Sequence, residues 1–408
     1  MFQFHHAQLS NGLEVIAEVD DLAQSLAVGY MVKTGSRDEG PRVGGVSHFL
    51  EHMLFKGTPK RSSEDINREL DEMGAQSNAF TSNEVTCYWA HVLPEFGERA
   101  LELLAALIRP TLRRADFAME KKVILEEVSQ YLDRPTQVLF EEVMADHFGA
   151  HPLAGSVLGT AESITALTSP RMRDYFQSRY GPSNMVLAVT GQVDFAAFMK
   201  NTERYCGSWS GPPALREYPP LTYTPSRRHI RQAKLKRHYI AMLCPGPSAQ
   251  DERRYAAQVL ADVLGDQEGS RLFWALVEPG LADEVEFSYF PHDGSGSFLA
   301  FASCDPARSQ QVEEILLTEM KKAVDHGCST QEVERSKNKI ETATVLQGEL
   351  PLGRMRNLAA RWVYNHEYRT MEQDLALLEG IGCGDLEKVL KAFPFAPLTM
   401  TTMGPGRV

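Results

Sequence analysis

Alternating and short apolar runs predict a sheet in the first half of the chain. Two alternating segments, 4–9 and 13–18, flank Asn11-Gly12, a dipeptide that favours the tight turn of a β-hairpin. Other strands of this half are predicted by a continuous apolar run, which is typical of a strand buried on both faces of a sheet. Further strands are predicted over residues 26–32, 76–82, 85–93 and 185–191.

Helical patterns lie between these strands. The first predicted helix ends at Gly57-Thr58-Pro59, and the second has Ser62 or Ser63 as its N-cap and Gly74 just beyond its end. The helices of this half are predicted over residues 46–56, 63–73, 95–109 and 116–132.

A change of composition divides the chain near its middle. Residues 207–236 contain two Pro-Pro pairs and a basic run from Arg227 to Arg237, which together favour a solvated linker. Beyond the linker, strands are predicted over 239–243, 284–289 and 298–303, and helices over 252–264, 271–277, 310–326 and 330–346. We therefore predict an α+β protein with two similar α/β-sandwich domains, each an antiparallel-rich sheet with helices packed on one face. The predicted limits are 1–210 for the first domain, 211–235 for the linker and 236–408 for the second domain.

Composition narrows the classes of partner. The chain of 408 residues has a formal net charge of -12, which argues against sequence-independent binding of nucleic acid. Its six cysteines form no CxxC pair and are widely spaced, as expected for free thiols in a reducing compartment. We see neither a secretory signal nor an apolar run long enough to span a membrane, so we expect a cytoplasmic protein.

The first predicted helix carries a candidate metal site, in the segment His48-Phe49-Leu50-Glu51-His52. Because each helical residue turns by about 100°, His48, Glu51 and His52 fall within an arc of about 100°. Two imidazoles four residues apart can bind one zinc ion, and a carboxylate on the same face can take a proton from water at that ion. The order inverts the more familiar His-Glu-x-x-His arrangement. An ordinary surface helix is the alternative, but the apolar flanks favour a buried helix whose polar groups need partners.

A third ligand is expected from another segment, and the helix 116–132 offers three glutamates. Glu120 and Glu127 are seven residues apart and share the edge of the apolar face, whereas Glu126 points well away from it. Helical geometry thus favours Glu127 or Glu120 as the inward ligand. Solvated surface charges remain the alternative for all three.

Several motifs together resemble the pitrilysin-like zinc metallopeptidases, and in particular the small-chain branch that includes the mitochondrial processing peptidases and their bacterial relatives. The resemblance covers the first half strongly and the second half in length and layout. The motifs that carry it are GGVSHFLEHMLFKGT (44–58), GAQSNAFTSNEVTCYWA (74–90), EKKVILEEV (120–128), HPLAGSVLGT (151–160) and YGPSNMVLAVTGQVD (180–194).

The resemblance implies a role for each matching residue. His48, His52 and Glu127 would be the ligands of one Zn²⁺ per chain, and Glu51 would be the general base. Glu120 would be a second functional glutamate that supports a ligand. The segment Asn78-Ala79-Phe80-Thr81 would form an edge strand that binds substrate, with Asn78 near the scissile bond, and Glu84 would support a ligand histidine.

One departure from the family pattern concerns the second domain. The family supplies an Arg and, seven residues later, a Tyr that hold the substrate or stabilise the oxyanion. Here Val277 and Asp283 stand at those positions, with one residue lost between them, and Arg271 matches a different, structural arginine. Neither Val277 nor Asp283 can polarise a carbonyl group. Tyr289 is a weak substitute, and a partner subunit is another source of the missing pair.

The sequence therefore predicts a zinc-dependent endopeptidase that cleaves extended or unfolded peptides inside a homodimer or a heterodimer with a paralogue. The first domain would carry the zinc and the catalysis, and the second would line a substrate chamber. Two alternatives stay open: a zinc-bearing subunit active only with a paralogous partner, and a non-catalytic scaffold subunit.

Overall fold

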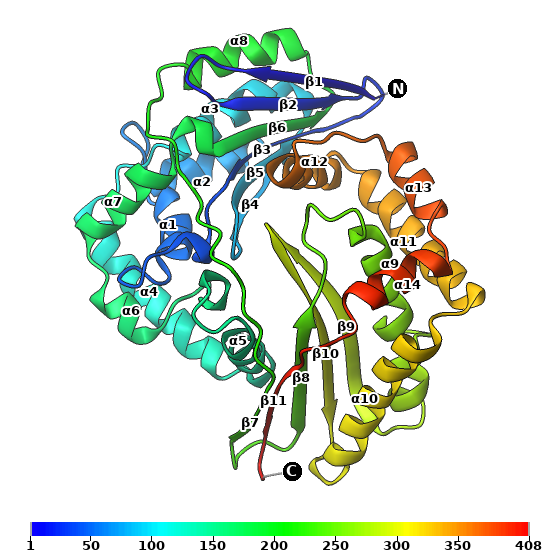
Figure 1. Ribbon diagram of the computed structural model, residues 1–408. Coiled ribbons are helices and arrows are strands. Elements are labelled where there is room, and N and C mark those ends of the chain that lie inside the picture. Colours follow the sequence, from blue (N-terminus) through cyan, green and yellow to red (C-terminus); the bar gives the residue numbers. More distant parts are fainter. Residues whose placement is uncertain (1, 407–408) are drawn as a thin grey trace. The chain divides into compact units, whose positions relative to one another are not determined.

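The computed structural model describes residues 2–406 and contains two compact units (Figure 1). The first unit comprises Met1–Gln130, Gly155–Glu217 and Leu346–Thr370, and the second comprises Tyr131–Ala154, Tyr218–Val345 and Met371–Val408. Each unit is built on one mixed sheet with helices packed against it. The predicted α+β fold class with antiparallel-rich sheets is thereby confirmed.

The first unit contains a six-stranded sheet in the order β1-β2-β6-β3-β5-β4. Its strands are β1 (Gln3–Gln8), β2 (Glu14–Val19), β3 (Leu26–Val32), β4 (Gln76–Thr81), β5 (Thr86–Val92) and β6 (Met185–Gly191). Only the β2–β6 pair is parallel. Strand β4 is the last in this order, which places it at the edge of the sheet beside α1 (Val46–Leu54).

The helices of the first unit follow the strands in the sequence. They are α1, α2 (Ser63–Glu72), α3 (Gly97–Leu107), α4 (Arg114–Leu132, which runs past the limit of the unit), α6 (Ala161–Ala166), α7 (Ser169–Arg179), α8 (Phe195–Cys206) and α12 (Pro351–Asn365), with short η turns at Ser36–Asp38, Pro94–Phe96 and Pro182–Asn184. The predicted N-cap Ser62 accepts a hydrogen bond from the Asp65 amide at 3.1 Å.

The second unit repeats this arrangement with a five-stranded sheet in the order β7-β11-β8-β10-β9. Its strands are β7 (Ser226–Arg231), β8 (His238–Pro245), β9 (Ala282–His292), β10 (Ser295–Cys304) and β11 (Thr399–Gly404). Its helices are α5 (Pro135–Phe148), α9 (Arg254–Gly265), α10 (Ser309–His326), α11 (Thr330–Gly348), α13 (Met371–Glu379) and α14 (Cys383–Ala392), with a π turn η5 (Phe273–Val277) and η turns at Pro152–Ala154 and Pro306–Arg308.

Both sheets have the same topology once β1 is set aside. In each, the first strand pairs in parallel with the last, the last lies beside the second, and the fourth lies between the second and the third. The two units are therefore structural repeats, although their sequences show no evident repeat.

Each sheet is buried on both faces, which adds a layer to the predicted arrangement. Strand β3 points Val28 and Tyr30 into the core under α1 and α3, and points Ala27 and Met31 into a second core under α12. In the same way α5 covers the second face of the other sheet. This double burial explains why the strands read as continuous apolar runs.

The two units also interleave along the chain, whereas the sequence-based division into 1–210 and 236–408 is linear. Helix α12 belongs to the first unit and α5 to the second, because each completes the uncovered face of a sheet far away in the sequence. The predicted linker is also shorter than 211–235, since its basic part forms β7. Two of its arginines pair with acids there: Arg227 with Glu313 at 2.8 Å, and Arg228 with Asp146 at 2.7 Å.

Candidate metal centre

Helix α1 begins at a backbone position that requires glycine. Gly45 has φ 84°, and a β-carbon there would lie 2.5 Å from the Leu158 carbonyl oxygen. The Glu39 carboxylate accepts hydrogen bonds from the amides of Gly45 at 2.6 Å and Ser47 at 2.7 Å. These bonds satisfy amides that a helix N-terminus leaves free, so the start of α1 is fixed.

The apolar side of α1 anchors the helix in the core. Phe49 is fully buried and stacks on Phe117 of α4, with ring centroids 4.9 Å apart. Leu50 and Met53 are buried as well. Because this face is fixed, His48, Glu51 and His52 are held on the other face, toward α4 and β4.

Helix α4 presents two glutamates to α1. Glu120 is buried, the Glu127 side chain is 41% exposed, and Glu126 is exposed. The structure thus places Glu120 and Glu127 on the inward side and Glu126 on the solvent side, as the helical spacing predicts.

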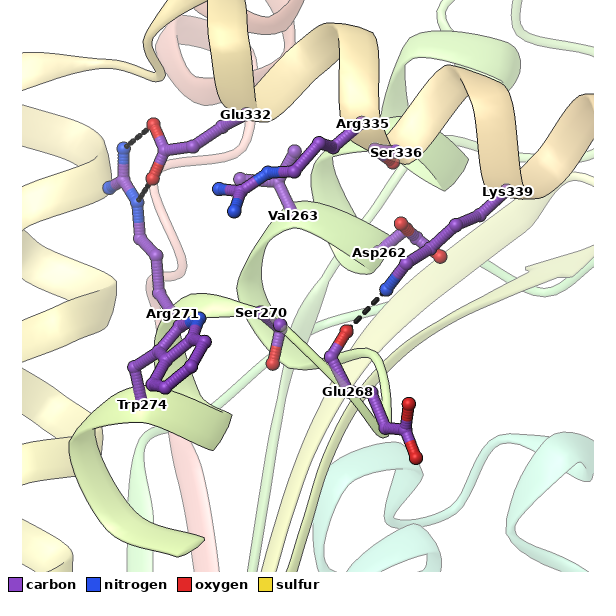
Figure 2. A pocket seen from close by; sticks show the side chains of 11 residues that line it. Asp262, Val263, Glu268, Ser270, Arg271, Trp274, Glu332, Arg335, Ser336 and Lys339 are labelled. Carbon is purple, nitrogen blue, oxygen red and sulfur yellow. Dashed lines mark hydrogen bonds and ion pairs between the residues drawn. The ribbon is translucent and has the colours of Figure 1, made fainter. Parts of the chain in front are cut away.

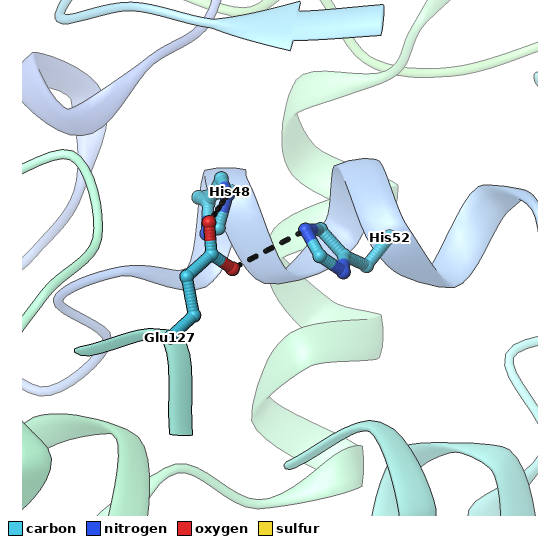
Figure 3. Close-up of side chains that lie close together, drawn as sticks. All are labelled: His48, His52 and Glu127. Carbon is cyan, nitrogen blue, oxygen red and sulfur yellow. Dashed lines mark ion pairs between the residues drawn. The ribbon is translucent and has the colours of Figure 1, made fainter. Parts of the chain in front are cut away.

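Ligand atoms of His48, His52 and Glu127 all lie within 4.8 Å of one another (Figure 3). The two carboxylate oxygens of Glu127 lie 3.7 Å from His48 Nε2 and 3.6 Å from His52 Nε2. This is the one group of three histidine, cysteine or acidic side chains among residues 2–406 whose ligand atoms converge in this way.

The other ring nitrogen of His52 is occupied by Glu120. His52 Nδ1 lies 2.9 Å from Glu120 Oε1, and Lys56 Nζ lies 2.7 Å from Glu120 Oε2. The lysine partner compensates the charge of a carboxylate that is only 3% exposed. A carboxylate at Nδ1 leaves the Nε2 lone pair directed at Glu127 and the candidate metal position.

His48 is neutral in this environment. Burial, with a smaller effect from His52, lowers the pKa of His48 to about 4. At neutral pH its ring therefore keeps one nitrogen lone pair, which a metal ligand requires.

Glu51 lies between the two histidines in sequence and contacts β4. The Thr81 hydroxyl donates a hydrogen bond to Glu51 Oε2 at 2.6 Å. Burial raises the pKa of Glu51, and the Thr81 hydrogen bond opposes this rise. The charges of His52 and Glu127 also act on this carboxyl group, which therefore lies in the electrostatic field of the candidate centre.

The segment from Asn78 to Thr81 is an edge strand, but its side chains have different surroundings. Ala79 packs in the core on the α1 side, whereas Phe80 packs on the α12 side with Arg356 over its ring at 5.3 Å. Asn78 lies on the same face as Phe80 and accepts a hydrogen bond from the Ala79 amide at 2.8 Å. Among the predicted substrate-binding residues, the side chain that donates a hydrogen bond to Glu51 is that of Thr81.

Glu84 lies in a different network from the one expected. Its carboxylate accepts hydrogen bonds from Arg37 at 2.5 Å and from the Tyr364 hydroxyl at 3.0 Å. The carboxylate at Nδ1 of His52 is that of Glu120. Glu84 forms an ion pair with Arg37 of the loop before α1 and a hydrogen bond with Tyr364 of α12.

In the second unit, the residues at the family's Arg and Tyr positions are engaged elsewhere. Val277 packs against the core, and Asp283 pairs with Arg237. The Tyr289 hydroxyl donates a hydrogen bond to the Pro247 carbonyl at 2.8 Å. Arg271 makes a two-point contact with Glu332 at 2.6 and 2.9 Å, as expected of a structural arginine.

A separate cavity of about 110 Å³ lies in the second unit between α9, η5 and α11 (Figure 2). Its charged side chains include the Arg271–Glu332 pair and Lys339, which bonds to the Glu268 carbonyl and to Asp266. It has no converging group of metal ligands, so it does not duplicate the centre on α1.

Sequence reasoning missed two contacts of the site, Lys56 with Glu120 and Thr81 with Glu51. Lys56 follows His52 by four residues, and this spacing was the available signal for a shared partner. Nothing local links Thr81 to Glu51, since strand pairing decides which face of β4 meets α1.

Comparison with known proteins identifies the family. A family model described as "Insulinase (Peptidase family M16)" matches residues 14–161, and one described as "Peptidase M16 inactive domain" matches residues 166–340. The chain belongs to peptidase family M16, which confirms the pitrilysin-like resemblance seen in the motifs.

Relatives along almost the whole chain are named zinc proteases. An uncharacterized zinc protease of Bacillus subtilis, YmxG, is 30% identical over 383 residues, covering 93% of this chain and 92% of the relative. An uncharacterized zinc protease of Streptomyces coelicolor is 31% identical over 415 residues, covering 97% of this chain and 88% of the relative.

Solved structures show the same fold. A protease from Helicobacter pylori superposes with a TM-score of 0.92 at 19% identity, covering 99% of this chain and 100% of the other. A peptidase M16 inactive domain from Pseudomonas fluorescens gives 0.92 at 18% identity, covering 100% and 98%. None of the helices described for residues 2–406 is long and apolar enough to cross a membrane.

Proposed function

We propose that this chain is a zinc-dependent endopeptidase that cleaves extended or unfolded peptides, with His48, His52 and Glu127 as the zinc ligands and Glu51 as the general base. The observation that carries the proposal is the convergence of these three ligand side chains beside a partly buried carboxylate. Membership of peptidase family M16 and relatives named zinc proteases support the same reading.

The three side chains fit a zinc ion. Zinc bonds of about 2.0–2.2 Å in a tetrahedron put neighbouring ligand atoms about 3.3 Å apart. The carboxylate oxygens of Glu127 lie 3.6 and 3.7 Å from the two Nε2 atoms, too far for good hydrogen bonds but close to that separation. A set of two imidazoles and one carboxylate, with a fourth position left open, is typical of catalytic zinc.

Each side chain then has a defined task. Zinc bound at this site would supply a Lewis acid that polarises both water and the scissile carbonyl group. Glu51 accepts the proton of the attacking water and returns it to the leaving amine. The Glu120 carboxylate accepts a hydrogen bond from Nδ1–H of His52 and so orients this ligand. Glu120 is therefore a positioning residue.

The substrate is held, in this proposal, as an added strand on β4. Because β4 ends the strand order of its sheet, one of its edges is free to pair with an extended peptide backbone. Backbone pairing requires little of the peptide sequence, and folded proteins do not offer such a strand. Unfolded polypeptides should therefore be cleaved and their folded forms spared.

Metal analysis with two variants tests the proposal. The purified chain should contain one zinc per chain, and Glu51→Gln should keep the zinc but lose peptide cleavage. Glu126→Gln, an exposed residue next to Glu127, should leave both unchanged. Full turnover in Glu51→Gln would reject the base, and a chain that folds but binds no zinc would favour a non-catalytic scaffold.

A second candidate is a zinc-bearing subunit that is active only with a paralogous partner. It is favoured by the second unit, where Val277 is apolar, Asp283 is paired with Arg237, and the Tyr289 hydroxyl is bonded to Pro247. Peptidase assays with native mass determination separate the two candidates. Turnover by a homodimer of this chain would exclude the partner requirement, whereas zinc binding without turnover, restored by a paralogue, would establish it.

A bacterial cytoplasm is the location we propose. The six cysteines form no disulfide and five of them are buried, which suits a reducing compartment, and the two relatives named above are bacterial.

A further inference from the structure

We propose that Thr81 is a positioning residue that sets the orientation of the Glu51 carboxylate, rather than a residue that contacts the substrate. The inference rests on the proposed function, because it assigns Thr81 a role toward the proposed general base. The observation is the hydrogen bond from Thr81 Oγ1 to Glu51 Oε2, at 2.6 Å.

The direction of this hydrogen bond is fixed by its surroundings. An ionised carboxylate only accepts, so the single hydroxyl proton of Thr81 must be donated to Glu51. A second oxygen, Thr86 Oγ1, lies 3.5 Å from Thr81 Oγ1, but Thr86 donates its own proton to the Thr34 carbonyl at 2.9 Å. The shorter, charge-assisted hydrogen bond therefore keeps the Thr81 hydroxyl proton directed at the Glu51 carboxylate.

The strand pairing holds the Thr81 hydroxyl in place. Thr81 is directly opposite Thr86 of β5, and Thr86 is fully buried. The turn between β4 and β5 begins immediately after Thr81, and a hydrogen bond from the Ser82 amide to the Val85 carbonyl at 2.9 Å closes it. Threonine is also stiff about its first side-chain torsion, so the hydroxyl is presented to Glu51 at little entropic cost.

Orientation matters for a glutamate base because its terminal torsion is broad. With Oε2 held by Thr81, the carboxylate plane is fixed and Oε1 is left to meet the attacking water. Without this bond the carboxylate can rotate, and fewer of its orientations place an oxygen within reach of the water.

The experiment replaces the hydroxyl while keeping the shape of the side chain. Thr81→Val should lower kcat about 10- to 100-fold, the loss expected for a hydrogen bond to a charged group, and leave KM and zinc content unchanged. Thr81→Ser restores the hydroxyl and should recover most of kcat. A rise in KM with kcat preserved would overturn the proposal and indicate contact with the substrate.

A measurement on the metal-free protein gives an independent readout. The ¹³C resonance of the Glu51 carboxyl carbon, assigned by its loss in Glu51→Gln, should shift in Thr81→Val and return in Thr81→Ser at the same pH. An unshifted resonance in Thr81→Val would contradict the proposal. If Glu51→Gln keeps full turnover, the proposed function fails. If Glu51→Gln is inactive while Thr81→Val keeps its kcat, only the role of Thr81 fails.

Discussion

The two units of the molecule have the same strand order, yet only the first carries a candidate metal centre. Helices α1 and α9 occupy the same place in this order, each following the second of the common strands. Helix α1 reads VSHFLEHML and turns His48, Glu51 and His52 toward α4. Helix α9 reads RYAAQVLADVLG and buries alanine, valine and leucine instead.

The difference shows that the fold supplies a position and the side chains supply the chemistry. In the first unit, α4, the second helix after the β4–β5 hairpin, brings both Glu120 and Glu127 to α1. In the second, α11 has the corresponding place after the hairpin, and its Glu332 is held by Arg271.

The largest effect is expected from removing a proposed ligand. Glu127→Ala leaves only the two histidines of the three converging groups, so zinc should be lost and peptide turnover should fall at least about 1000-fold, or about 4 kcal/mol. Zinc content and turnover are the measurements. Glu126→Ala is the matched control, and an equal loss in both variants would indicate damage to α4 rather than to a metal site.

Helices α12 and α5 each lie in the sequence between segments of the other unit, and they offer the next test of the comparison. Met355 of α12 and Leu139 of α5 are both fully buried, each under the second face of a different sheet. Met355→Ala and Leu139→Ala should each cost about 2–5 kcal/mol of stability. Hydrogen exchange should show the first variant loosening β3 and β6 and the second loosening β8 and β11. Loosening of the same strands by both variants would contradict the assignment of these helices to separate units.

Acid should destabilise the second unit through His147. Burial, with a smaller effect from His292, lowers the pKa of His147 to about 4, so the unfolded chain takes up this proton first as the pH falls. His147 therefore does not reduce the free energy of unfolding above pH ~6.5. Between pH ~6.5 and pH 4 it lowers the free energy of unfolding by up to about 3 kcal/mol. Chemical unfolding across this range should give a flatter pH dependence for His147→Gln. The same slope in wild type and variant would exclude His147.

A smaller effect is expected from removing the charge of Glu120, the carboxylate that bonds to His52. Glu120→Gln keeps a hydrogen-bond acceptor but removes the charge, and should weaken zinc binding about 10- to 100-fold. Competition with a chromophoric chelator measures this change, with Glu126→Gln as the control. Unchanged affinity would mean that Glu120 only completes an ion pair with Lys56.

Much of the site follows from sequence because helical spacing is local. Residues three, four or seven apart on one helix share a face, which brings His48, His52 and Glu51 together and separates Glu127 from Glu126. Most strands were predictable from their apolar or alternating runs, but β7 and β11 were not. Contacts between distant segments were not: neither the burial of α12 under the first sheet nor the hydrogen bond from Thr81 to Glu51 has a local signal. The linker limit failed for the same reason, since β7 is stabilised by acids from other segments.

Anomalous diffraction at the zinc absorption edge tests the central claim most directly. We expect a single strong peak in the first unit, within bonding distance of His48 Nε2, His52 Nε2 and a carboxylate oxygen of Glu127. Crystals grown with zinc that show no peak between these side chains, or a Glu127 carboxylate turned away from both imidazoles, would contradict it.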